Sequence, residues 1–230
     1  MEVAHNLDRV PRQPFLIFLT AMAGGPPAGD PDALAALLAR QQPLLGPDPW
    51  IQALSAAGLG LTWMYAGELD RARREFTVAL RGFRAIGERW GMVMALTATA
   101  ELAYLRNDPA AAIAPIDEAL RLAGELGSAI DLADLLRVRG DGHARTGDLD
   151  RADADYASAV ESARRAGAPE TAAAALAGLG EVARQRGDPG AARRRYEEAL
   201  AQCPTGWYGA EAIRSDIHLA LRRIGPVTAG

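Results

Sequence analysis

Residues Gly147–Ala159 read G-D-L-D-R-A-D-A-D-Y-A-S-A, and three further stretches of the chain follow the same pattern. They are Gly67–Ala79 (G-E-L-D-R-A-R-R-E-F-T-V-A), Asn107–Ala119 (N-D-P-A-A-A-I-A-P-I-D-E-A) and Gly187–Ala199 (G-D-P-G-A-A-R-R-R-Y-E-E-A). The copies begin at 67, 107, 147 and 187, so each step is 40 residues. A fixed period of about 20 to 50 residues is typical of solenoids, in which each repeat packs only against its neighbours. The sequence therefore predicts a repeat array.

Each copy is predicted to join two helices at its first residue, which is Gly or Asn. Either residue tolerates the left-handed backbone conformation that ends many helices. The first helices are expected over residues 50–66, 89–106, 129–146 and 169–186, and the second helices over 69–86, 109–126, 149–166 and 189–202. The predicted fold class is all-α, a right-handed solenoid of antiparallel helix pairs.

The array is expected to occupy residues 50–203, in repeats that cover 50–88, 89–127, 128–167 and 168–203. Residues 204–230 follow it, and 207–224 are predicted to form an amphipathic capping helix. An array needs such a cap because its last repeat otherwise exposes an apolar face. If the cap is incomplete, the same edge would serve for a homodimer.

Residues 1–49 are predicted to form a degenerate N-terminal helical hairpin. Its first helix would cover the apolar run Phe15–Ala23. Arg12, this run and its A-M-A end also resemble a signal peptide, whereas Glu2 and Asp8 in the leader argue against one. The alternative to a hairpin is therefore export.

The composition is that of a soluble folded protein, with 49% hydrophobic and 23% charged residues. The net charge of −4 gives no basic surface for nucleic acid or an anionic membrane, and no apolar stretch approaches the length of a membrane span. All 25 cations are Arg, because the sequence has no Lys. One Cys and three scattered His predict neither an internal disulfide nor a metal site. We expect a cytoplasmic protein without cofactors.

Small residues recur at fixed places in the helix pairs and predict close helix packing. A large residue lies between two alanines on one face of each second helix, opposite a small residue in the first. The alanines are Ala72, Ala112, Ala152 and Ala192, then Ala79, Ala119, Ala159 and Ala199. The large residues are Phe76, Ile116, Tyr156 and Tyr196, and the opposing small residues are Gly60, Ala100, Gly140 and Gly180.

This arrangement resembles the tetratricopeptide (TPR) repeat, whose signature Gly140, Ala152, Tyr156 and Ala159 match in order. The resemblance covers residues 50–203. The commonest TPR has about 34 residues, so the longer repeat here resembles the MalT-like subgroup. That subgroup forms the C-terminal part of large bacterial transcription regulators.

A narrower resemblance is to the C-terminal TPR region of actinobacterial AfsR/SARP-type activators. It rests on Asp48-Pro49-Trp50, on Gly67-Glu68-Leu69-Asp70 and on the run F-R-A-I-G-E-R-W-G from Phe83 to Gly91. The family's DNA-binding and nucleotide-binding parts have no counterpart here, and a phosphate loop of the G-x-x-x-x-G-K-[ST] type is ruled out by the lack of Lys. The resemblance therefore implies transcription regulation without direct DNA binding by this chain.

In the TPR family the first helices line a concave groove in which partners bind. The resemblance implies that the following residues face it: Thr97, Glu101, Tyr104, Asp134, Arg137, Asp141, Arg145, Glu181 and Arg184. Arg137, Asp141 and Arg145 stand four apart and form one charged stripe. The stripe could hold a peptide carboxylate; alternatively, it is a row of salt bridges on a solvated helix face.

Four other features each have a functional and a structural explanation. Arg139 is unusual, since Leu59, Thr99 and Leu179 hold its place in the other copies. His143 near Asp141 suggests an acid–base pair, but residues two apart on a helix do not face each other, so a packed His is favoured. The run 193–195 is three arginines among acids, which favours a solvated face over a phosphate site. Residues 63–65, beside Met92 and Met94, would line a groove for a partner helix or belong to the core.

No nucleophile–base pair, metal cluster or phosphate loop is visible, so we expect no enzyme. The sequence predicts a protein-interaction module that binds a protein, peptide or small effector in its groove. The alternative is a stand-alone adaptor or peptide receptor unrelated to transcription.

Overall fold

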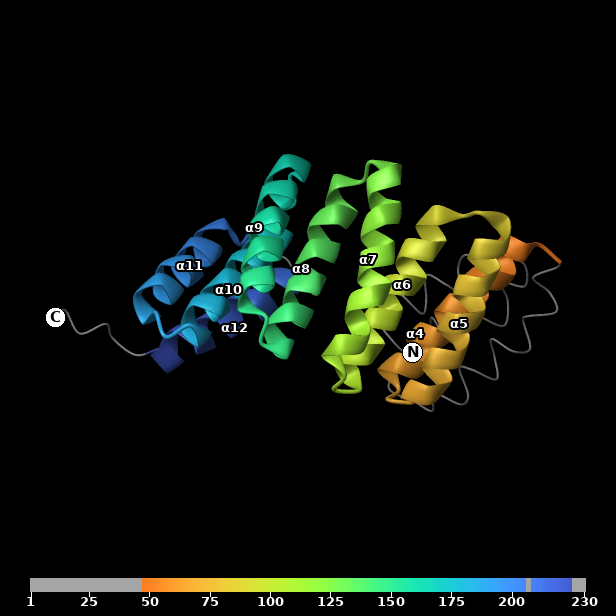
Figure 1. The fold of residues 1–230 in the computed structure, drawn as a ribbon, viewed down its shortest axis with the longest axis horizontal. Helices are drawn as coiled ribbons and strands as arrows, with labels where there is room; N and C mark the ends of the chain where they lie inside the picture. The colour runs from red at the N-terminus through yellow and green to blue at the C-terminus, as the bar shows by residue number, and fades with distance from the viewer. Residues whose placement is uncertain (1–46, 206–207, 225–230) are drawn as a thin grey trace, which may run out of the picture. The chain divides into compact units, whose positions relative to one another are not determined.

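The structure is a computed structural model that describes residues 47–205 and 208–224. Within these ranges the regular elements are all α-helices (Figure 1). The predicted all-α class is therefore confirmed. The predicted N-terminal hairpin and the stretch that resembles a signal peptide lie outside the described residues, apart from the last few positions of the hairpin.

Helix ends in the described ranges fall within one residue of those predicted. The helices are α4 (Pro49–Tyr65), α5 (Leu69–Ile86), α6 (Arg89–Leu105), α7 (Pro109–Leu126), α8 (Ala129–Thr146), α9 (Leu149–Ala166), α10 (Pro169–Gln185), α11 (Pro189–Gln202) and α12 (Tyr208–Ile224).

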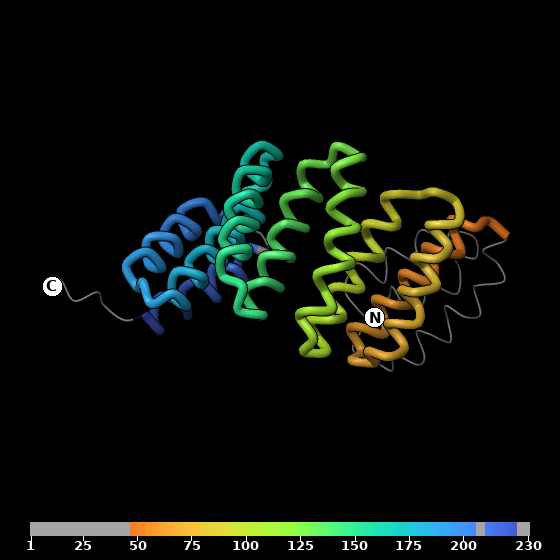
Figure 2. Tube along the Cα trace, viewed as in Figure 1, coloured from red at the N-terminus to blue at the C-terminus, as the bar shows by residue number. Residues whose placement is uncertain are grey.

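Backbone contacts divide the chain into two compact units, Met1–Asn107 and Asp108–Gly230. In the first unit α5 packs against both α4 and α6. In the second, consecutive helices from α7 to α11 pack against one another, and α12 packs against α10 and α11, as the chain trace in Figure 2 shows. Each unit is thus built from consecutive helix pairs. The division into a hairpin, four repeats and a cap remains a prediction.

The turns explain why the helix ends were predictable. Asn107, with φ of 58°, has a positive φ like the glycines of the other turns, for example Gly147 at 84°. After three of the four turns an Asp caps the next helix; for example, Asp148 Oδ1 accepts a hydrogen bond of 3.2 Å from the Arg151 amide. Glu68 makes no such side-chain bond. The turn residue and the acid beside it therefore mark where each pair folds back.

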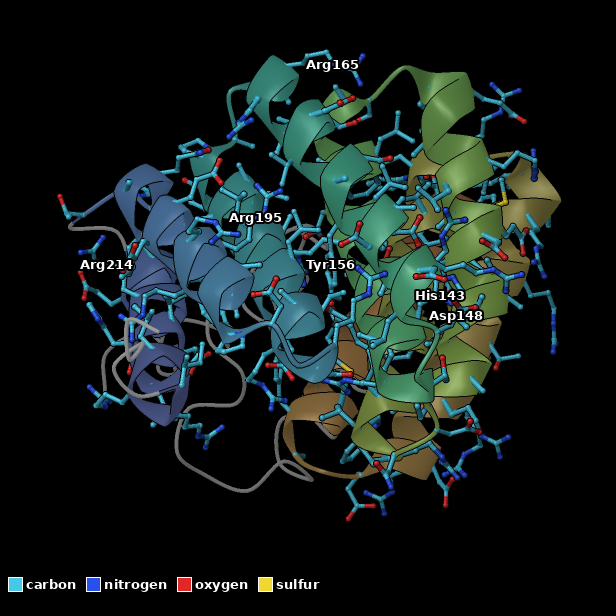
Figure 3. All side chains as sticks on the ribbon, turned by 60° about the vertical axis from the view of Figure 1, so that its left-hand side comes forward. His143, Asp148, Tyr156, Arg165, Arg195 and Arg214 are labelled. Carbon is cyan, nitrogen blue, oxygen red and sulfur yellow. The ribbon has the colours of Figure 1, made fainter. Side chains whose placement is uncertain are left out.

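The repeated alanines belong to the core, and all eight have no exposed surface. The Tyr156 ring, which is 3% exposed, lies between two helices that carry glycine against it (Figure 3). A Cβ atom would come within 2.9 Å of the ring at Gly140 of α8 and within 2.5 Å at Gly178 of α10. Small residues at both places are a packing requirement; the sequence predicted the one at Gly140 but not the one at Gly178.

Ion pairs connect successive helices at the surface. Arg106 Nη1 lies 2.6 Å from Asp70 Oδ1 at the end of α6 and the start of α5. Arg186 makes the equivalent contact with Asp150, also at 2.6 Å. In the pair α7–α8 the equivalent residues are Ala110 and Thr146, which are uncharged, so this ion pair does not form there.

Helix α12 covers the apolar end of the second unit. Ile217 is buried in a cluster with residues of α9, α10 and α11. Arg214 Nη1 donates to the backbone oxygens of Leu200 at 3.3 Å and Cys203 at 3.2 Å. Because these carbonyls close α11 and carry its negative dipole end, the Arg214 cation stabilises the junction.

Candidate functional site

Three of the predicted groove residues form one network on α8. The Arg137 guanidinium donates two hydrogen bonds to Asp134 Oδ1, at 3.2 Å from Nε and 2.9 Å from Nη2. Its Nη1 donates to Asp141 Oδ2 at 2.9 Å. Arg137 thus bridges carboxylates three residues before it and four after it, which are neighbours on a helix surface.

A tyrosine from the core joins this network. The Tyr156 hydroxyl of α9 donates to Asp141 Oδ1 at 2.6 Å. Partial burial raises the pKa of Asp141 above its ordinary value, although Arg137 and the Tyr156 hydroxyl act in the opposite direction. The stripe thus contains the salt bridges of the structural alternative, between Arg137 and the acids three residues before it and four after it, and its central acid is also tied to the core.

The next repeat has the same contact 40 residues on. The Tyr196 hydroxyl of α11 donates to Glu181 Oε2 of α10 at 3.2 Å. Arg184 donates to both Glu181 oxygens, at 2.7 Å from Nε, and Gln185 Nε2 adds a bond of 2.9 Å. The hydrogen bonds from Arg184 lower the pKa of Glu181, while burial and Glu181 raise that of Tyr196. The two equivalent acids thus have pKa values shifted in opposite directions.

Arg139, the unusual residue of α8, connects three helices. Its Nε and Nη2 donate to the two Asp155 oxygens of α9 at 2.8 and 2.7 Å. Its Nη1 donates to Asp117 Oδ1 of α7 at 2.6 Å. These bonds to Asp155 and Asp117 raise the pKa of Arg139. Asp155 is one of the few charged side chains that are buried, so this arginine has a structural explanation.

His143 is packed, as favoured from the sequence. It is 6% exposed, and its Nε2 lies 3.8 Å from Asp155 Oδ2, which is longer than a hydrogen bond. Its nearest acid is thus Asp155 of the facing helix and not Asp141, two residues before it. The acid–base pair considered above does not form.

The remaining predicted groove residues are three residues of α6 and Arg145 of α8. Thr97, Glu101 and Tyr104 belong to α6 in the first unit. The Thr97 hydroxyl donates within its own helix, to the Val93 oxygen at 2.9 Å. Arg145 is exposed at the end of α8. The structure therefore assembles two charged groups from the predicted set, one on α8 and one on α10.

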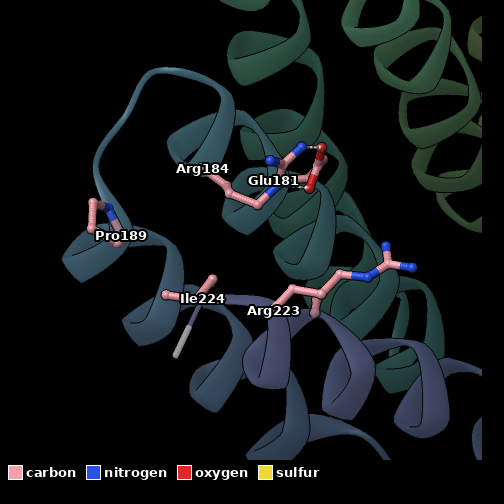
Figure 4. Close-up of a pocket in the computed structure, with 6 residues that line it drawn as sticks. Glu181, Arg184, Pro189, Arg223 and Ile224 are labelled. Carbon is pink, nitrogen blue, oxygen red and sulfur yellow. Dashed lines mark hydrogen bonds and ion pairs between the residues drawn. The ribbon is translucent and has the colours of Figure 1, made fainter. Parts of the chain in front are cut away.

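A pocket opens beside the second of these groups (Figure 4). It has a volume of about 420 Å³. Its lining comes from α10, from the first residue of α11 and from α12, and consists of Glu181, Arg184, Pro189, Ala220, Arg223 and Ile224. Half of the lining is apolar and half charged.

The other surface alternatives resolve into packing or local pairing. Trp63, Met64 and Met92 are buried, whereas Tyr65 is exposed; Arg71 stacks on the Trp63 ring, 4.5 Å from its centroid. In the arginine run, residue 193 lies 3.7 Å from Glu197 and residue 195 lies 3.1 Å from Glu198. These pairs fit a solvated helix face.

Among residues 47–205 and 208–224, no group of three His, Cys, Asp or Glu side chains is placed to hold a metal ion. In the same part of the chain, no helix combines the length and apolarity that crossing a membrane requires.

Sequence reasoning missed the two tyrosine hydroxyls, the partners of Arg139, and Arg223. The first two were recoverable. Tyr takes the place of Phe76 and Ile116 in the last two copies, and an acid lies fifteen residues before each Tyr; Glu101 also lies fifteen residues before Ile116, which has no hydroxyl to meet it. Because Gly140 faces Tyr156, position 139 lies close to α9, and the acids near 156, such as Asp155, were the partners to consider. Nothing in the repeat pattern marks Arg223, which lies beyond the last copy.

A protein-family model for the tetratricopeptide repeat matches residues 131–205. These residues include α9, α10 and α11 with both tyrosines. The match supports a TPR assignment for this part of the chain. No curated protein matches the sequence.

Three solved structures share the fold at low identity. BtubC from P. vanneervenii is 18% identical with a TM-score of 0.67, over 88% of this chain and 78% of that one. A signal transduction ATPase with numerous domains (STAND) from Pyrococcus horikoshii, which has a tetratricopeptide repeat sensor, is 16% identical with a TM-score of 0.76; the match covers 95% of this chain and only 32% of that one. A thermophilic TPR protein from Thermus thermophilus is 21% identical with a TM-score of 0.57, over 91% of this chain and 97% of that one. At such identities the likeness concerns the fold, and it supports a TPR-like helix-pair architecture.

Proposed function

We propose that this chain is a non-catalytic protein-interaction module, and that it binds a protein, peptide or small effector on the face formed by the first helices α8 and α10. One observation carries the proposal. The described pocket includes Glu181 and Arg184, two of the residues that the TPR resemblance assigned to a binding groove. A concave site with apolar walls and a few polar groups is the usual form of a ligand site.

We further propose that the module is the effector-sensing region of a bacterial transcriptional regulator and works in the cytoplasm. The resemblance to activator TPR regions supports this role. So does the Pyrococcus STAND protein, since it has a TPR sensor and this chain spans 32% of its length. In such an arrangement the module would bind an effector and pass the signal to other domains.

A stand-alone adaptor or peptide receptor is the second candidate. The observation in its favour is the Thermus TPR protein, of which this chain covers 97%. A protein of that size can therefore consist of such repeats alone.

The binding proposal is tested with a pair of charge reversals. Arg145→Glu changes the exposed end of the α8 stripe, whereas Arg194→Glu makes the same change on the second helix α11. Both chains, checked for helix content by circular dichroism, are used to capture proteins from a lysate of the source cells, with quantification against the parent chain. We expect a partner that the parent and Arg194→Glu retain and that Arg145→Glu loses. Equal retention by both variants would remove the α8–α10 face from the proposal.

The choice between regulator and adaptor is tested by the size of the native polypeptide, measured by blotting source cells with an antibody against this chain. A band far above 24.3 kDa supports a module within a larger regulator. A band at that mass favours the adaptor.

A further inference from the structure

The pocket between α10 and α12 contains one cation, Arg223, that forms no ion pair with any residue of the described part of the chain. Arg223 lines it from the last turn of α12. Among the residues that the structure describes, no carboxylate or backbone oxygen pairs with its guanidinium, and Figure 4 draws no interaction between Arg223 and the Arg184–Glu181 pair.

The charged side chains of the opposite wall, Glu181 and Arg184, already have hydrogen-bond partners within the protein. Glu181 accepts hydrogen bonds from Arg184, Gln185 and Tyr196, so its oxygens have little capacity left for a ligand donor. Arg184 in turn is committed to Glu181 by two bonds. These two side chains form a neutral pair, and the pocket lining keeps a net charge of +1 from Arg223.

The rest of the lining is apolar. Ala220 and Ile224 lie four apart on α12, one turn along the same face, and Pro189 begins α11 across from them. A ligand that fits this lining places an apolar group against these three residues and a single negative charge next to them. A phosphate dianion fits less well, because its two negative charges would meet only the one positive charge of Arg223 in a chain whose net charge is −4.

We propose that this pocket binds a peptide segment in which a carboxylate side chain is adjacent to an apolar one. Arg223 binds the carboxylate, and Ala220, Ile224 and Pro189 contact the apolar side chain. This inference rests on the proposed interaction function and specifies the chemistry of its partner. The planar guanidinium can donate two parallel hydrogen bonds to a carboxylate, which favours an acid over an amide.

The test uses two probe peptides, acetyl-Gly-Leu-Asp-Gly-amide and acetyl-Gly-Leu-Asn-Gly-amide, titrated into the full chain and followed by backbone amide chemical shifts. We expect the Asp peptide to shift amides around Ala220–Ile224 in a saturable way and the Asn peptide to bind about tenfold more weakly. Arg223→Gln should lose the preference for Asp. Arg222→Gln, which removes a neighbouring arginine outside the pocket lining, should keep it.

Three results would overturn the inference. Equal binding of both peptides would show that only the apolar wall is recognised. Inorganic phosphate that competes as strongly as the Asp peptide would make this a general anion site. Absence of any shift near α12, while a partner is still lost with Arg145→Glu, would reject the pocket and leave the proposed function in place.

Discussion

The Tyr156 hydroxyl donates a hydrogen bond of 2.6 Å to Asp141, and this bond joins the packing core to the charged face of α8. The ring fills the space that two glycines leave open, while the hydroxyl reaches the acid that Arg137 also holds. A change of charge at Asp141 therefore also alters a hydrogen bond of the buried Tyr156 side chain.

Tyr156→Phe should destabilise the chain by about 1 kcal/mol, because it removes a hydrogen bond to a partly buried carboxylate and keeps the ring. Tyr196→Phe should cost less, since its bond of 3.2 Å is longer and Glu181 keeps donors from Arg184 and Gln185. Urea unfolding followed by circular dichroism compares the two. A larger loss for Tyr196→Phe would contradict the role assigned to Asp141.

Gly178→Ala should destabilise the second unit by about 1–3 kcal/mol, because the new Cβ would lie 2.5 Å from the Tyr156 ring. Gly124→Ala is the matched control in α7, where nothing lies within 4 Å of a new Cβ. That variant should gain about 0.5–1 kcal/mol, since Ala favours a helix more than Gly does. In thermal unfolding, the melting temperature should fall for Gly178→Ala and rise for Gly124→Ala. A rise for both variants would show that the Tyr156 ring is not confined by Gly178.

Arg139→Leu should cost about 2–3 kcal/mol, because it leaves the Asp155 carboxylate buried without its two charged hydrogen bonds. The double variant Arg139→Leu/Asp155→Leu should recover most of that loss, since an apolar pair needs no compensation. Equilibrium unfolding of parent, single and double variants forms the test. A double variant no more stable than the single one would mean that Asp155 does not depend on Arg139.

The opposite pKa shifts of Glu181 and Asp141 predict opposite pH dependence. The folded-state pKa of Glu181 is lowered, so its ionised form stabilises the fold above about pH 4.5, and the contribution is lost as pH falls through the folded value. The folded-state pKa of Asp141 is raised, so the parent's advantage over Asp141→Asn shrinks as pH rises from 3.8 through the folded value. Melting temperatures of the parent, Glu181→Gln and Asp141→Asn between about pH 3 and 6 measure both slopes. If both contributions to stability change with pH in the same direction, the opposite pKa shifts of the two acids are refuted.

The sequence was sufficient for the helices and for their close contacts. A left-handed turn needs Gly or Asn, and a close helix approach needs Ala or Gly, so each leaves a residue-type signature at a fixed place. Asn107 adopts a positive φ, and Ala152 and Ala159 are fully buried, as these rules require.

The charged contacts were not predictable to the same degree, because a long side chain can reach partners on its own helix or on a facing one. Arg137 bonds within α8, whereas Arg139, two residues later, bonds to α7 and α9. Only the register of the facing helix distinguishes the two outcomes. The spacing of fifteen residues between acid and tyrosine could have been found by comparing the copies. Arg223 could not have been found in this way, because it lies beyond the last copy.

The helix-to-helix ion pairs described above all use arginine as the cation, at positions 106, 139 and 186. Since the sequence has no Lys, acetylation or ubiquitination of lysine side chains has no target among these contacts. Arginine also keeps its charge at every pH that a cell experiences. Lysine modification therefore cannot regulate these ion pairs, and amine-reactive reagents would find no lysine side chain to label.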